Sequence, residues 1–180
     1  MYFCILEIYF FILTMKKLLL LPFLMILVLS TFGQLSKQEQ KQLNAGVGLS
    51  SWGLPLYIGL DYGITNEITI GGEFTFRSYQ EKFNSIRYMH SIVGLQANAN
   101  YHFAHLINDL PPEIDIYGGI NAGFFLWMSP SSYPGERISR PGFGLQIGGR
   151  YALSNKLSGN IEISGGNAFA GVKMGLSLIL

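Results

Sequence analysis

The sequence predicts an all-β protein: an eight-stranded antiparallel up-and-down transmembrane β-barrel preceded by a cleavable signal peptide. Two observations carry this prediction. After residue 43, apolar and polar residues alternate with a period of two through one segment after another, and no long segment keeps the period of a helix. Ahead of these segments the chain carries a basic and then an apolar stretch of the kind that directs export.

The composition fits one well-packed domain and excludes several classes of function. Of the 180 residues, 49% are hydrophobic and 14% are aromatic, so we do not expect a disordered chain. From Gln34 onward ten Lys and Arg balance ten Asp and Glu, which gives no basic footprint for nucleic acid. The single cysteine, Cys4, provides neither a disulfide framework nor a lipid-anchoring cysteine after the apolar stretch.

The N-terminal region reads as a signal peptide. Lys16 and Lys17 precede an apolar run that ends in small residues at Thr31 and Gly33, which is the order of a secretory signal. We therefore predict a signal peptide over residues 15–33, with cleavage after Gly33.

Residues 1–14 fit poorly in front of this signal, so we interpret them as a gene-start artefact, with Met15 as the true start. Residues 34–42 form a polar lead-in to the barrel. The alternative is a permanent anchor over residues 2–29, which is long enough to cross a bilayer.

Eight alternating segments account for the barrel, which we place at residues 43–180. An even number of strands returns both chain ends to one side, as in bacterial single-chain barrels. The predicted strands cover residues 43–51, 55–63, 67–78, 88–103, 114–126, 142–153, 157–165 and 169–180.

Glycines on the polar face indicate that the apolar face points outward. A water-facing exterior has no need of glycine, which weakens strands, whereas a narrow eight-stranded lumen needs small residues between its larger side chains. A soluble lipocalin-like carrier, the alternative, would turn its apolar face inward. The polar-face glycines are Gly46, Gly48, Gly59, Gly63, Gly71, Gly94, Gly119, Gly123, Gly144, Gly148 and Gly175.

Aromatic residues of the apolar face lie near strand ends, which predicts two girdles at the membrane interfaces. The periplasmic girdle would contain Tyr62, Tyr101, Phe103 and Tyr151, and the outer one Phe76, Phe124 and Phe143. Short turns at 64–66 and 154–156 would face the periplasm, and the longer links at 79–87 and 127–141 would face outward. The long link at 104–113 departs from this asymmetry.

The inward charges predict a lumen closed by side chains. A short turn at 154–156 places Arg150 opposite Asn160 with Glu162 on the diagonal, and a turn near Asn167 places Glu162 opposite Lys173. We predict a network of Arg150, Glu162 and Lys173, because buried charges must be paired. A narrow pore is the alternative. The other charges of this face are Asp61, Glu73, Arg77 and Asp115.

These features resemble the small outer-membrane β-barrels, the OmpA/OmpX-like barrel domain, in a glycine-rich Bacteroidetes-type form. The most specific resemblance is to the C-terminal assembly signal, found here as Lys173, Gly175, Leu178 and Leu180. The resemblance implies a porin-like protein of the cell envelope, located in the outer membrane. Its partners would be outer-membrane lipid and, during biogenesis, the barrel-assembly machinery, which reads the last strand by strand addition. Leu180 departs from the pattern, which usually ends in an aromatic residue.

The sequence contains no convincing catalytic, cofactor-binding or metal site, so we predict a structural or surface-interaction role without enzyme activity or cofactor. An extracellular ligand would contact the loops at 79–90 and 127–141, and we expect a monomer. A lipid A-modifying enzyme is the alternative, with His90, Ser91, His102 or His105 as candidates. Neighbouring His90 and Ser91 point to opposite faces, and His90 and His102 lie about 40 Å apart along a strand, so neither pair forms one site.

Overall fold

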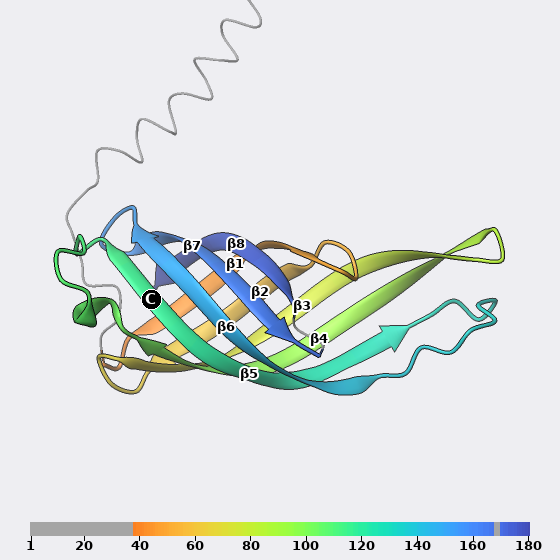
Figure 1. Cartoon of the computed structure of the whole chain (residues 1–180), viewed down its shortest axis with the longest axis horizontal. Coiled ribbons are helices and arrows are strands. Elements are labelled where there is room, and N and C mark those ends of the chain that lie inside the picture. Colours follow the sequence, from red (N-terminus) through yellow and green to blue (C-terminus); the bar gives the residue numbers. More distant parts are fainter. Residues whose placement is uncertain (1–37, 168–169) are drawn as a thin grey trace, which may run out of the picture.

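The computed structural model describes residues 38–167 and 170–180, so the predicted signal peptide and the upstream residues lie outside the described part of the chain. Eight antiparallel strands follow one another around a closed barrel (Figure 1). They are β1 (Lys41–Ser50), β2 (Leu56–Gly63), β3 (Ile68–Phe83), β4 (Ile86–His102), β5 (Ile114–Met128), β6 (Arg140–Ala152), β7 (Leu157–Gly166) and β8 (Gly171–Ile179).

Each strand pairs with its sequence neighbours, and β8 pairs with β1 to close the barrel. Gln42 lies opposite Ile179 and Ser50 lies opposite Gly171 in this closing pair. A 3-10 helix, η1 (Ala104–Leu106), lies in the connection between β4 and β5. No helix within residues 38–167 and 170–180 has the length and hydropathy needed to cross a bilayer.

The two ends of the barrel differ. At one end, which we call the terminal end, lie the C-terminus and the connections β2–β3, β4–β5 and β6–β7 (Figure 1). At the other, the hairpin end, β3 and β4 run far past the other strands, and the loop at 129–139 extends beside them (Figure 1).

The protruding hairpin corrects one prediction. The sequence predicts a loop at 79–87, but β3 and β4 continue to the pair Phe83 and Ile86. Only Asn84 and Ser85 form the turn, and both have positive φ, 47° and 68°, as a two-residue type I′ turn requires. The lead-in is also shorter than predicted, since β1 begins at Lys41.

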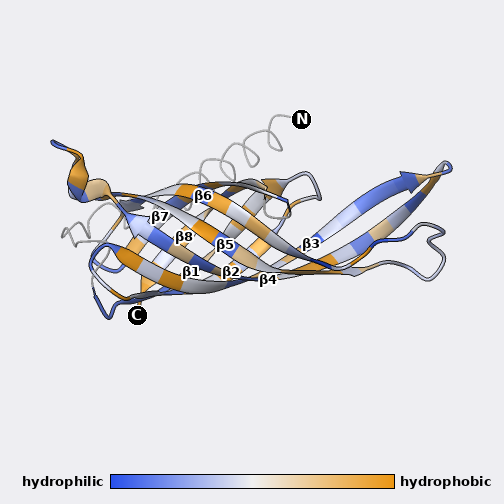
Figure 2. Cartoon of the chain, turned by 60° about the horizontal axis from the view of Figure 1, so that its bottom comes forward, coloured by the Kyte–Doolittle hydropathy of each residue, from blue (hydrophilic) through white to orange (hydrophobic). Residues whose placement is uncertain are grey.

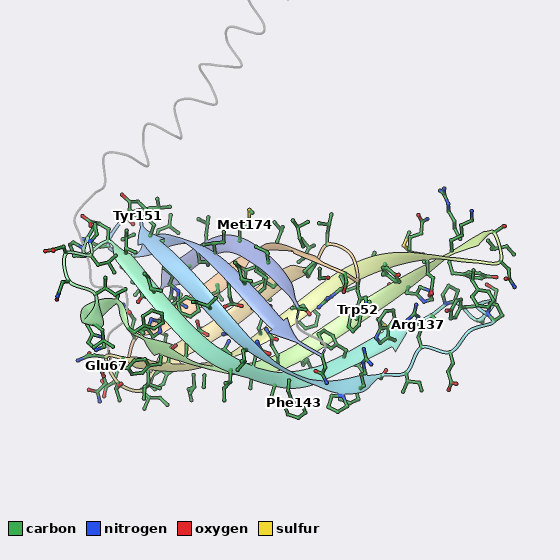
Figure 3. The ribbon with its side chains drawn as sticks, viewed as in Figure 1. Trp52, Glu67, Arg137, Phe143, Tyr151 and Met174 are labelled. Carbon is green, nitrogen blue, oxygen red and sulfur yellow. The ribbon has the colours of Figure 1, made fainter. Side chains whose placement is uncertain are left out.

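Apolar side chains cover the outside of the barrel and polar side chains fill the inside. Phe143 and Met174 point away from the wall (Figure 3) and are 64% and 52% exposed, whereas Arg150 is 4% exposed. Figure 2 shows hydrophobic residues distributed over the barrel strands and hydrophilic residues along the protruding part of β3. This is the arrangement of a membrane barrel, and it is the reverse of the one that a soluble carrier would need.

Candidate functional site

The lumen contains buried charged groups that reach across it from opposite walls. Arg150 on β6 donates from Nη2 to Asp61 Oδ2 on β2 at 2.9 Å, and its Nη1 lies 3.9 Å from Asp115 Oδ2 on β5. His102 places Nδ1 2.7 Å from the same Asp115 oxygen and Nε2 3.1 Å from Thr69 Oγ1. One guanidinium is therefore held between two carboxylates near the terminal end of the barrel.

A second group of charges is centred on Lys173 of β8. Its Nζ lies 2.7 Å from Glu73 Oε2 across the lumen on β3 and 2.9 Å from Glu162 Oε1 on the adjacent β7. Gln96 Nε2 donates to Glu73 Oε1 at 2.6 Å. Since an ammonium pairs with two carboxylates here, β3, β7 and β8 are linked through the interior.

The structure divides the predicted network of Arg150, Glu162 and Lys173. The register has Arg150 opposite Asn160 and Glu162 opposite Lys173, as the turn lengths predict. Glu162 contacts Lys173, but the ion pairs of Arg150 go to Asp61 and Asp115. The correction has a physical reason: Asp115 lies directly opposite Arg150 on the other neighbouring strand, and Asp61 reaches it across the lumen.

Two buried tyrosines lie in the lumen, and glycines make room for them. The Tyr117 hydroxyl donates to Glu162 at 3.0 Å, and the Tyr57 hydroxyl donates to Asn160 at 2.8 Å. A Cβ at Gly148 would meet the Tyr117 ring, and one at Gly175 would meet the Tyr57 hydroxyl. At these two positions the inward glycines therefore create the volume that the aromatic rings occupy.

Aromatic side chains pack together at the hairpin end of the barrel. Ile92 and Phe125 have no exposed surface, and Trp52, Tyr79 and Trp127 pack against them. The Trp52 ring lies 5.9 Å from Phe125 and 5.3 Å from Trp127 between centroids, with edge-to-face geometry in both pairs. We call these five residues the aromatic cluster, and Figure 3 shows Trp52 at this end of the barrel.

At the hairpin end, the loop at 129–139 forms an ion pair and hydrogen bonds with Glu81 of β3. Arg137 Nη2 lies 2.5 Å from Glu81 Oε1, its Nε donates to Oε2 at 3.1 Å, and Tyr133 donates to Oε2 at 3.0 Å. The hydrogen bond from Arg137 lowers the pKa of Glu81. Burial lowers the pKa of His90, whose Nε2 lies 3.4 Å from Glu81.

Arg77 differs from the other two lumen cations. It is 4% exposed, donates from Nη1 to Ser50 Oγ at 3.0 Å, and lies 5.0 Å from the centre of the Phe125 ring. No carboxylate of the described residues lies within 4.0 Å of its guanidinium.

The residues of the two predicted girdles lie at different levels along the barrel, and exposed Leu126 and Met128 lie beyond Phe124 toward the hairpin end. Tyr62, Tyr101 and Tyr151 are exposed near the terminal end, where Phe103 lies just past β4. Phe76, Phe124 and Phe143 are exposed closer to the hairpin end. In the predicted assembly signal, Lys173 and Gly175 face the lumen, whereas Leu178 and Leu180 are exposed outside.

The histidines reveal one arrangement that the sequence analysis missed. His90 Nδ1 lies 2.9 Å from the Ser129 hydroxyl, so a serine, a buried imidazole and the Glu81 carboxylate follow one another at the hairpin end. Ser91 lies on the neighbouring face, His102 lies in the lumen, and His105 is exposed in η1. Ser129 comes after a strand end, so alternation alone gave no signal that would bring it to His90.

The closed sheet, the apolar exterior and the polar lumen define the fold of a small outer-membrane β-barrel. Solved structures of that class are similar to the chain. A de novo designed transmembrane β-barrel matches with a TM-score of 0.52 and 16% identity, over 81% of this chain and 98% of that one. The N-terminal β-barrel domain of Pseudomonas aeruginosa OprF matches with a TM-score of 0.50 and 11% identity, over 79% and 98%.

Neisserial surface protein A is similar to the same extent, with a TM-score of 0.51 and 15% identity over 78% of this chain and 95% of that one. At these identities the likeness establishes the fold. No family model matches the sequence. No curated protein matches it either.

Proposed function

We propose that the chain is an integral outer-membrane protein with a structural or surface-interaction role and a lumen closed by side chains. The observation that carries the proposal is the contrast between the apolar barrel wall and the polar hairpin end, which projects well past it (Figure 2). Lipid would contact the wall, the barrel-assembly machinery would read β8, and the protein would act as a monomer without enzyme activity.

The hairpin end is the part suited to contact an external ligand. The earlier predicted contact regions, 79–90 and 127–141, lie side by side there and are joined by Glu81, Tyr133 and Arg137. Tyrosine, tryptophan and arginine are enriched where proteins bind partners. A surface held in place by such contacts also loses less conformational entropy on binding than a free loop does.

Trypsin treatment of intact cells tests the location and orientation. Cleavage at Lys82 or Arg87, in the hairpin, is expected before lysis, and cleavage at Lys156, in the β6–β7 turn, only after lysis. The folded protein should also migrate differently on gels with and without heating. Extraction without detergent, or cleavage at Lys156 from outside, would contradict the proposal.

Planar-bilayer recording of the refolded protein tests the closed lumen. The closed lumen is supported by the ion pairs of Arg150 and Lys173 and by the aromatic cluster, which lie inside a barrel whose eight strands leave little space for a channel. We expect no steady conductance, and a large steady conductance would favour the narrow-pore alternative.

A lipid-modifying enzyme is a second candidate, and it rests on the Ser129, His90 and Glu81 arrangement. A hydroxyl within hydrogen-bond distance of an imidazole is the arrangement of an activated nucleophile. Mass spectrometry of lipid A from cells expressing the wild type or Ser129→Ala, and from cells lacking the gene, tests this role. Identical lipid profiles would exclude lipid A modification.

A further inference from the structure

A small cavity lies beside Arg77 in the half of the lumen nearest the hairpin end. Its volume is about 30 Å³, and its polar lining consists of Ser50, Glu73, Thr75, Arg77, Gln96 and Lys173, with Ser164 at its edge. One water molecule needs about 10–15 Å³ of such space, so the cavity has room for a single small ion.

Charge favours an anion in this cavity. Its lining carries two cations, Arg77 and Lys173, against one carboxylate, Glu73. Lys173 is already paired with Glu73 at 2.7 Å and with Glu162 at 2.9 Å, so Arg77 is the cation of this lining that needs a counter-charge. Among the described residues, the guanidinium of Arg77 contacts a neutral hydroxyl and an aromatic ring and has no carboxylate within 4.0 Å, although a buried charge is stable only when it is compensated.

Two hydrogen-bond donors are available to such an ion. Arg77 Nε and Thr75 Oγ1 are both buried and have no hydrogen-bond partner among the described residues. Residues 75 and 77 lie two apart on β3, so their side chains share the lumen face and line the same cavity. A guanidinium N–H and a hydroxyl are the groups that hold small anions by charge-assisted hydrogen bonds.

We propose that this cavity is a binding site for one small monovalent anion, such as chloride, held by Arg77 and Thr75. The anion would serve as the counter-ion of Arg77. Lys173 would remain paired with Glu73 and Glu162, so the charge of Arg77 would hold the anion. The inference does not depend on the surface-interaction role, because it concerns only the lumen.

Chloride-35 NMR line broadening on the full chain, refolded in a neutral detergent, tests the site. We expect excess broadening that bromide competes away and that Arg77→Gln weakens about tenfold to hundredfold, the loss expected for a charged hydrogen-bond donor. Arg140→Gln is the matched control, because Arg140 is an exposed arginine near Trp52 that does not line the cavity.

Thr75→Val keeps the arginine and removes the second donor, so it tests the site even if Arg77→Gln fails to fold. It should weaken chloride binding about tenfold while the heat-dependent gel shift of the folded barrel persists. Crystals soaked in bromide would then show an anomalous peak within hydrogen-bond distance of Arg77 Nε. Unchanged broadening in both variants, no broadening in the wild type, or bromide only at other positions would overturn the proposal.

Discussion

The two halves of the lumen are filled in different ways. Near the terminal end, carboxylates hold Arg150, and farther along the lumen Glu73 and Glu162 hold Lys173. At the hairpin end the filling is aromatic, and Arg77 lies against Phe125. Where all the strands surround the lumen, charges can pair across it. Where the shorter strands have ended, aromatic rings from a loop and from the longer strands pack against one another. The difference shows that the interior of one barrel can be stabilised both by ion pairs and by aromatic packing.

Removal of Arg150 should have the largest effect. Arg150→Met leaves the buried carboxylates of Asp61 and Asp115 without their cation, and loss of one partner of a buried pair costs about 3–5 kcal/mol. Urea unfolding of the refolded protein in lipid measures the change. The double variant Arg150→Met with Asp61→Asn should recover part of the lost stability, and no recovery would argue against a charge effect.

Truncation of the aromatic cluster should have a smaller effect. Phe125 is fully buried between Trp52, Ile92 and the Arg77 guanidinium. Phe125→Leu should cost about 1–2 kcal/mol, less than the removal of the whole ring, because leucine refills part of the space. The same urea experiment applies, with Phe124→Leu, on the outer face of the same strand, as the control.

Loss of the Glu81 contacts should act locally. Glu81→Gln removes the charge that Arg137 pairs with, and since this pair is partly exposed the global stability should fall by less than about 1 kcal/mol. The loop at 129–139 should open more often, so trypsin should cleave after Arg137 several times faster. Glu136→Gln, an exposed acid in the same loop, is the matched control and should leave the cleavage rate unchanged.

Acid should produce the smallest change, a gradual loosening of the hairpin end. Burial lowers the pKa of His90, and the hydrogen bond from Arg137 lowers that of Glu81. Both groups therefore bind protons more readily in the opened state. The stability they contribute is present near pH 7, begins to decline as the pH falls below about 6.5, and declines further below the ordinary glutamate value.

Tryptophan fluorescence reports this change selectively, because the two tryptophans of the chain, Trp52 and Trp127, both belong to the aromatic cluster. His90→Gln should remove the first part of the response. A pH-independent spectrum in the wild type would show that these two groups do not control the opening of this end.

The sequence predicts the membrane barrel well because alternation is strict where one strand face meets lipid and the other meets the lumen. The prediction fails past Phe76, where the outward face of β3 becomes polar at Ser78, Gln80 and Lys82 and the contrast disappears, so residues 79–87 are wrongly assigned to a loop. The Asn84 and Ser85 pair was the available signal for a tight turn. The signal peptide, its cleavage site and the Bacteroidetes-type origin remain predictions.

The lumen pairs could be predicted only where a short turn fixes the register. The turn at 154–156 and the connection near Asn167 place Glu162 opposite Lys173. The contact between Arg150 and Asp115 depends on how β5 and β6 align across a long loop, and the one with Asp61 depends on closure of the whole barrel. Neither can be derived from spacing along the chain.

The pairing of β8 with β1 has a consequence for how the protein forms. The closing contact joins residues near opposite ends of the described chain, so the ring cannot be completed until the last strand is in place. Until then the first and last strands each present an unpaired edge, which favours aggregation. Contacts between such distant residues also slow folding, so we expect formation of the native state to be a late, cooperative step.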